Sequence, residues 1–190
     1  GYTKYNMGIS STAIATINAQ ATTVTNPQMG ANKADDVVVV WAGSVDLYQA
    51  VGTSNAITTF NNLKAYCLYV KSLGSKVVVV TMLPRPNNTV VFSKTEYLAY
   101  NALIRAHWTE FADELADVQT DSRIGTDASN YDTTYYADLV HLTQVGYEIV
   151  ASYVQDALNR VDSSFPASVP VTPPVLTVAQ RLLNAGFTQA

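Results

Sequence analysis

An aspartate and a histidine three residues apart, Asp138 and His141, have the residue types and spacing of an acid-base pair. In such a pair the carboxylate accepts the imidazole Nδ1–H, fixes the tautomer and stabilises the imidazolium that forms when Nε2 takes a proton. A hydrolase uses this chemistry to activate a hydroxyl nucleophile. The same spacing also occurs where an aspartate caps a helix beside a surface histidine, so the spacing alone leaves both interpretations open.

Few other side chains in the sequence are candidates for acid-base or nucleophilic chemistry. The second histidine, His107, lies in a helical pattern beside Trp108, where we expect a structural or surface role. Asp46 is expected to cap the helix that follows it or to tie down its turn. The single cysteine, Cys67, excludes an internal disulfide and falls on an apolar helix face, so we expect it to pack as a small hydrophobic side chain.

The composition narrows the class of protein. A chain of 190 residues with 48% hydrophobic and 14% charged residues predicts one globular domain with a full core. A net charge of −4, with scattered lysines and arginines, argues against a nucleic-acid partner or an anionic membrane surface. The longest apolar run, residues 37–43, is too short to span a bilayer, and residues 1–5 begin a strand-like pattern rather than a signal peptide. The polar, charge-poor composition fits an extracellular or virion setting but leaves the localisation open.

Strand and helix patterns alternate along the chain. The apolar runs at 36–41 and 76–81 show no alternation, as expected of parallel strands covered on both faces. Shorter strands are expected at 2–6 and 116–120, and helices at 12–23, 57–73, 97–111 and 145–161. This order predicts a three-layer α/β fold around a parallel sheet.

The topology also predicts where a site would lie. Reactive groups in such sheets lie beyond the carboxyl ends of the strands, which places three loops on one rim: residues 7–11, residues 42–46 and the loop that ends at His141. The domain is expected to span residues 1–162. A Pro/Ser-rich linker at 163–175 and an amphipathic helical tail at 176–190 are expected to follow, with the tail docking on the domain or on a partner chain.

Residues 5–161 resemble the SGNH, or GDSL-like, hydrolases, which are serine esterases and lipases. The run Asp138-Leu-Val-His141-Leu-Thr-x-x-Gly146-Tyr147 is similar to the last block of this family, in which Asp and His complete a Ser-His-Asp triad. Residues 6–11 resemble the second block, and residues 43–47 resemble the third block, G-x-N-D. The resemblance implies a three-layer flavodoxin-like (SGNH hydrolase) parallel sheet, with His141 as the general base and Asp138 as its orienting carboxylate.

The resemblance also implies the rest of a site. Backbone N–H groups near Ser11 and Gly43 would receive the oxyanion. Apart from the resemblance, Ser44, Val45 and Tyr136 are candidates to line an acyl or sugar site, and a surface position in a long loop is the alternative for Tyr136. The substrate would be an ester or an acylated sugar, with no metal and no cofactor.

The chain departs from the family pattern in three places. Ser11 stands where the second block has a glycine, and its backbone N–H can still donate if its φ and ψ permit. The first block, a Gly-Asp-Ser turn that bears the nucleophile, would precede Gly1. Val45 replaces the asparagine of the third block, and losing one such oxyanion donor typically costs about 10²–10³ in rate. Ser44 follows a strand in a tight turn, as a nucleophile does, but it occupies the variable position of the third block, which favours a turn role.

The missing block would leave the first strand of the fold absent from between residues 2–6 and 36–41. Unpaired buried backbone groups cost about 1–3 kcal/mol each. We therefore expect an upstream segment or a second chain to supply this strand and the serine, since Pro170, Pro173 and Pro174 make the tail a poor central strand. Two functions remain open: an ester hydrolase whose serine lies outside the printed chain, or a catalytically reduced SGNH-like module for binding or structure in a larger surface or virion protein.

Overall fold

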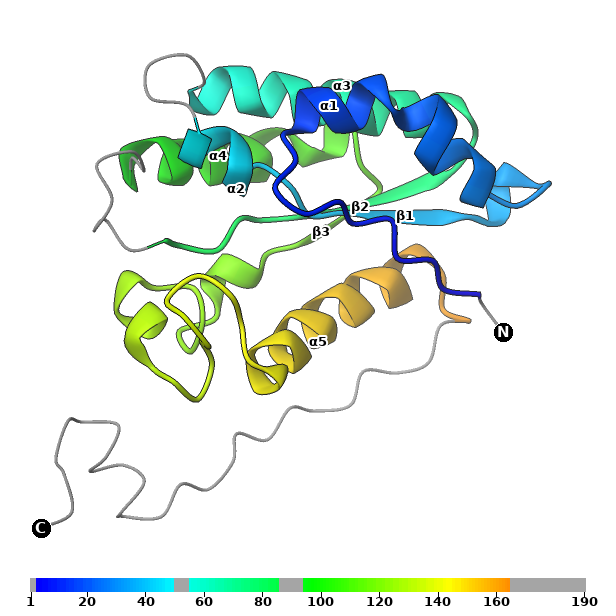
Figure 1. Cartoon of the computed structure of the whole chain (residues 1–190). Helices are drawn as coiled ribbons and strands as arrows, with labels where there is room; N and C mark the ends of the chain where they lie inside the picture. The colour runs from blue at the N-terminus through cyan, green and yellow to red at the C-terminus, as the bar shows by residue number, and fades with distance from the viewer. Residues whose placement is uncertain (1–2, 50–54, 86–93, 165–190) are drawn as a thin grey trace, which may run out of the picture.

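A parallel sheet of three strands forms the middle layer of the molecule (Figure 1). The computed structural model describes residues 3–49, 55–85 and 94–164. The strands are β1 (Val37–Val40), β2 (Lys76–Val80) and β3 (Glu114–Ala116), in the order β1-β2-β3. In this register Val38 pairs with Val77, and Val79 pairs with Leu115. The α/β class with a parallel sheet, predicted from the alternating pattern, is confirmed.

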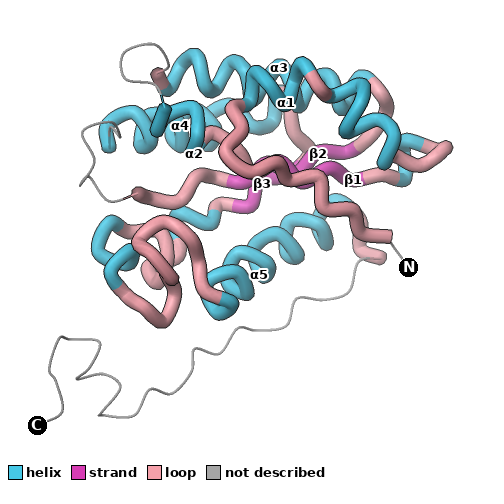
Figure 2. The backbone as a smooth tube through the Cα atoms, viewed as in Figure 1, coloured by secondary structure: helices cyan, strands magenta, loops and turns pink. Residues whose placement is uncertain are grey.

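Helices cover both faces of the sheet (Figures 1 and 2). One face carries α1 (Ile14–Ala19), α2 (Ser44–Gln49), α3 (Ala56–Ser72) and α4 (Lys94–His107), and the other carries α5 (Gln144–Val161). Because alternate residues of a strand point to opposite faces, Val77 and Val79 join the core under the first group while Val78 and Val80 join the core against α5. The predicted three layers are therefore present.

The N-terminal region differs from the expectation. Residues 3–9 form no strand, so the strand expected at 2–6 is wrong over its described part, and Met7 instead packs against the core under α1 and α3. The helix expected at 12–23 is α-helical only to Ala19 and continues as a wider turn over Ala21–Thr25. Four of those five residues are β-branched and disfavour a regular helix.

The third strand is displaced from its expected position. It occupies residues 114–116 rather than 116–120, and a short 3-10 turn, Val118–Thr120, follows it. Asp117 explains the change, because its carboxylate accepts hydrogen bonds from Arg105 at 2.7 and 2.8 Å and from the Thr81 hydroxyl at 2.9 Å. These bonds take the chain out of the strand direction directly after Ala116.

The strand β1 presents an apolar edge. Its partner is β2, and its other side pairs with no strand in the described part of the chain. Val38 and Val40 are buried, whereas Val39 is 40% exposed and Trp41, the next residue after the strand, is also 40% exposed. An exposed apolar edge offers unpaired N–H and C=O groups to a further strand.

Cys67 packs in the core of the helix-rich face, as predicted, and is fully buried. Burial raises the pKa of its thiol to about 12, which keeps it neutral and unreactive.

The expected linker and tail, residues 163–175 and 176–190, lie outside the described residues from residue 165 onward. None of the helices in the described ranges combines the length and the apolar character that crossing a bilayer would require.

Candidate active site

Asp138 and His141 lie on a tight turn directly before α5. The Ala137 N–H donates to the His141 carbonyl at 2.7 Å, and the Thr143 N–H donates to the Tyr135 carbonyl at 2.8 Å, so the two sides of the turn are bonded to each other. Leu139, inside the turn, has φ of 69°, a left-handed conformation that is uncommon for a residue with a side chain. Strained backbone of this kind persists where the surroundings enforce it, and it is concentrated at functional sites.

The two side chains form a close pair. The Asp138 Oδ2 lies 2.7 Å from Nδ1 of His141, while Oδ1 accepts the His141 N–H at 2.7 Å and the Val140 N–H at 3.2 Å. The backbone bond from His141, followed by its ring, lowers the pKa of Asp138 to about 2. The carboxylate is therefore ionised at neutral pH. Its contribution to stability is complete above the ordinary pKa of about 4 and is lost as the pH falls toward 2.

Residues at the start of α5 hold this turn in place. Thr143 caps the helix by accepting the Gly146 N–H at 3.3 Å, and its hydroxyl donates to the Thr134 carbonyl at 2.6 Å. Gly146 lies so close to the preceding loop that a Cβ would come 2.4 Å from the Tyr135 carbonyl oxygen. A glycine is required here because this neighbour is backbone and cannot rotate away.

The substitution Gly146→Ala is therefore expected to destabilise the protein by about 1–3 kcal/mol, the usual cost of overpacking. This effect opposes intrinsic helix propensity, which favours alanine over glycine. Urea denaturation of the purified variant measures it. Gly8→Ala is the matched control, because its added Cβ would meet only the exposed Asn6 side chain, at 3.1 Å. A Gly146→Ala variant as stable as the parent protein would show that this close approach does not exist.

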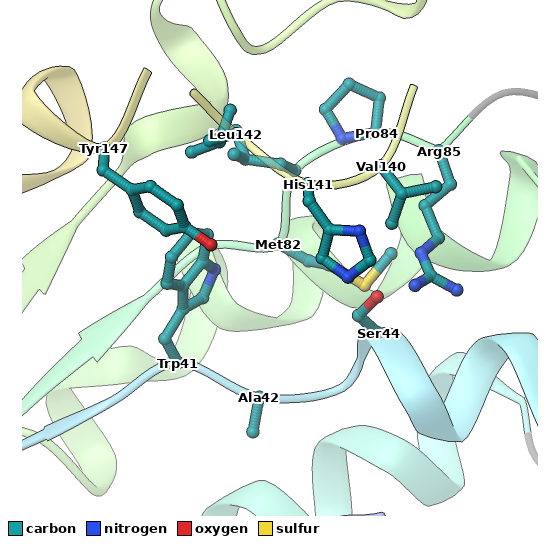
Figure 3. Close-up of a pocket in the computed structure, with 11 residues that line it drawn as sticks. Trp41, Ala42, Ser44, Met82, Pro84, Arg85, Val140, His141, Leu142 and Tyr147 are labelled. Atoms are coloured by element: carbon teal, nitrogen blue, oxygen red, sulfur yellow. The ribbon is translucent and has the colours of Figure 1, made fainter. Parts of the chain in front are cut away.

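His141 faces a small pocket with a volume of about 170 Å³. The pocket lies between the residues that follow β1, the residues that follow β2 and the turn before α5 (Figure 3). It is lined by Trp41, Ala42, Ser44, Met82, Leu83, Pro84, Arg85, Val140, His141, Leu142 and Tyr147. These residues occupy the rim at the carboxyl ends of the strands, where the topology places a site.

Two of the sequence-predicted site residues line this pocket, and a third, Asp138, contacts one of them. His141 and Ser44 line it from opposite sides, and in Figure 3 the Ser44 hydroxyl and the imidazole point into the same hollow. Asp138 contacts the imidazole through Nδ1, which leaves Nε2 as the ring nitrogen available to a substrate or nucleophile. The His141 side chain is 69% exposed, so the pocket is open to solvent on this side.

Gly43 adjoins the pocket and is fixed by a close contact. It has φ of 111°, and a Cβ would lie 2.7 Å from the Tyr100 ring, whose hydroxyl donates to the Ala42 carbonyl at 3.0 Å. Only a glycine satisfies both conditions. The turn that carries Ser44 is therefore held by the buried Tyr100.

The remaining predicted residues lie away from the pocket lining. Tyr136 is 1% exposed and its hydroxyl donates to the Ile124 carbonyl at 2.6 Å, so it packs in the core rather than against a substrate. Val45 follows Ser44 in α2 but does not line the pocket. Ser11 is exposed, with φ of 55°, in the conformation that favours the glycine of the family's second block.

Asp46 has a structural role, but at a different helix from the expected one. Its two carboxylate oxygens accept the Ile14 N–H at 3.1 and 3.2 Å and so cap the N-terminus of α1 rather than the helix that contains it. Burial raises the pKa of Asp46. The contact joins the start of α1 to α2, the helix that begins at Ser44.

Two residues of the site escaped sequence reasoning, Asn130 and Arg85. The Asn130 Nδ2 donates to the Pro84 carbonyl at 3.1 Å and to the Leu139 carbonyl at 2.8 Å, so one side chain joins the loop after β2 to the turn of the Asp138–His141 pair. Its partners lie 46 and 9 residues away, and no local pattern reveals such a link. Arg85 is the one cationic side chain among the lining residues.

Comparison with known proteins identifies the family and the fold of the chain. Residues 1–149 match the model of the GDSL-like Lipase/Acylhydrolase family. A GDSL-like lipase of Bacteroides thetaiotaomicron is similar in structure, with a TM-score of 0.67 at 21% identity over 81% of this chain and 74% of that chain. A Bacteroides fragilis protein classed with the acylhydrolases is also similar in structure. Its TM-score is 0.63 at 22% identity, over 81% of this chain and 73% of that chain. No curated protein sequence matches. Because the family model spans most of its length, the chain belongs to the GDSL-like lipase/acylhydrolase family.

Proposed function

We propose that this chain carries the base and the orienting carboxylate of an ester hydrolase that acts on small acyl esters, acetylated sugars among them. The observation that carries the proposal is the Asp138–His141 pair, joined at 2.7 Å, with the imidazole lining a pocket on the strand rim. The nucleophilic serine of this enzyme lies in polypeptide outside the printed chain.

The reaction follows from the two ring nitrogens. The His141 Nε2 takes the proton of the serine hydroxyl as its oxygen attacks the ester carbonyl, and the imidazolium then gives that proton to the departing alkoxide. Water, activated by the same nitrogen, hydrolyses the acyl-enzyme. Asp138 holds Nδ1–H throughout and stabilises the imidazolium. The backbone N–H groups near Gly43 receive the oxyanion, since Val45 has no side-chain donor and Ser11 lies away from the pocket lining.

The size of the pocket supports a small acyl group. A cavity of about 150 Å³ holds one benzene ring, whereas sites for drug-sized ligands reach roughly 300–1,000 Å³. The observed 170 Å³ therefore suits a short acyl chain or a single ring. Trp41, Met82 and Leu142 supply apolar surface for it.

The apolar edge of β1 supports an added strand. In the described part of the chain β1 is an edge strand, and the side away from β2 pairs with no strand. A strand that paired there in parallel with β1 would run toward the same rim as His141, which is where the nucleophile is needed.

A serine-reactive fluorophosphonate probe tests the proposal. We expect it to label the full native assembly, which is this chain together with the polypeptide that supplies the serine. We do not expect it to label the 190-residue chain alone. Ser44→Ala is the matched control, because Ser44 is the serine that lines the pocket. Labelling of the isolated chain that disappears in Ser44→Ala would make Ser44 the nucleophile and contradict an external serine.

The second candidate function is a binding or structural module without catalysis. Val45 favours it, because the side-chain donor of the third block is replaced by an aliphatic group. A full native assembly that the probe fails to label would select this function.

A further inference from the structure

Arg85 places a cationic group in the pocket beside His141 and Ser44. In Figure 3 its side chain runs down the wall of the pocket and its guanidinium is directed toward the hollow that these two side chains face. The Arg85 Cζ lies 4.7 Å from the centroid of the Tyr48 ring, in a cation–π contact. Such stacking uses the face of the guanidinium and leaves the N–H donors at its edge free for a ligand.

One of these donors is buried without an acceptor. The Arg85 Nε is inaccessible to solvent and forms no hydrogen bond within residues 3–49, 55–85 and 94–164. Burial lowers the pKa of Arg85, and the nearby Asp138 carboxylate opposes that shift. A donor desolvated in this way beside a pocket is satisfied when a ligand brings an acceptor to it.

We propose that Arg85 binds a carboxylate of the substrate, so that the pocket selects esters that carry a negative charge close to the scissile carbonyl. The inference rests on the proposed function, because it names the substrate class of the same site. A guanidinium presents paired N–H donors that match the two oxygens of a carboxylate. Asp138 places a negative charge nearby, and this favours a singly charged carboxylate over a doubly charged phosphate.

A binding experiment on the native protein tests the inference without catalysis. The probes are two amides that resist hydrolysis, succinamate with a terminal carboxylate and butyramide with a methyl group in its place, titrated by calorimetry. We expect the protein to bind succinamate about ten- to a hundredfold more tightly, as a hydrogen bond to a charged group would give. Arg85→Gln is expected to abolish this preference, and Arg85→Lys, which keeps the charge, to retain part of it.

Arg160→Gln is the matched control. Arg160 pairs with Glu114 near the far end of α5, about 24 Å along the helix from its start beside the turn. The Arg160→Gln substitution removes the same charge as Arg85→Gln. We expect this variant to keep the full preference for succinamate. Equal binding of the two amides, or a preference that survives in Arg85→Gln, would overturn the inference. Tighter binding of inorganic phosphate than of succinamate would overturn the choice of a carboxylate.

Hydrolysis by the full native assembly separates this inference from the proposed function. The matched esters are p-nitrophenyl hydrogen succinate and p-nitrophenyl butyrate. A preference for succinamate together with no hydrolysis of either ester would refute the hydrolase and leave the anion site standing. Hydrolysis of both esters at equal rates, with equal binding of the two amides, would refute the role of Arg85 and leave the hydrolase standing.

Discussion

His141→Ala is expected to lower kcat/KM of the full native assembly for a small acyl ester by about 10³, within the 10²–10⁴ that a positioned general base contributes. The variant removes the nitrogen that takes the serine proton and later returns it to the leaving group. His141 is exposed, so its removal leaves the core intact and its effect falls on the rate rather than on folding. Initial rates with p-nitrophenyl acetate measure the loss.

His107→Gln is the control for this variant. Its Nδ1 lies 2.7 Å from Glu110 Oε1 in an exposed pair at the end of α4. That helix returns to the start of β3, so His107 lies at the end of the sheet opposite the pocket. We expect the activity of the His107→Gln variant to equal that of the parent protein. An equal loss in both variants, or full activity in His141→Ala, would remove His141 from the mechanism.

Asp138→Asn is expected to lower kcat by about 10²–10⁴ with little change in KM, as the same change does in serine hydrolase triads. An asparagine oxygen can still accept the Val140 and His141 N–H groups and keep the turn. Its amide nitrogen would then face Nδ1, where it donates rather than accepts. The ring is forced into the tautomer with Nε2 protonated, and this tautomer cannot take a proton from serine.

Asp138→Ala separates the two tasks of this carboxylate. It removes the acceptor for two backbone N–H groups as well as the partner of the ring, so we expect lower stability in urea together with the loss of activity. Asp138→Asn is expected to unfold at nearly the parental urea concentration. If Asp138→Asn loses as much stability as Asp138→Ala, its lost activity reports a collapsed turn and not a wrong tautomer.

The regular part of the fold was predictable because its pattern is local. Four consecutive valines fixed the position of β1, and the helical spacing of apolar residues located α3 and α5 within a residue or two. The N-terminal strand was wrong because a short strand needs a neighbouring strand with which to pair. The third strand was displaced because Asp117 bonds to Arg105 and Thr81, which lie elsewhere in the chain.

The site likewise combines a local pattern, which the sequence reveals, with contacts between distant residues, which it does not. Asp138 and His141 are three residues apart, so a sequence pattern can indicate that they form a pair. Arg85 and Asn130 reach the pocket through contacts with Tyr48, Pro84 and Leu139 that exist only in the folded chain. The reason for Gly146 is likewise tertiary, since the backbone of Tyr135 excludes a Cβ there.

Nitrogen-15 NMR of the His141 ring tests the central claim most directly, because it reports the tautomer without requiring the serine. At a pH where the ring is neutral, the Asp138 contact predicts a proton on Nδ1 and none on Nε2, with the reverse in Asp138→Asn. A proton found on Nε2 of the parent protein would contradict the role of Asp138 and, with it, the assignment of His141 as the base.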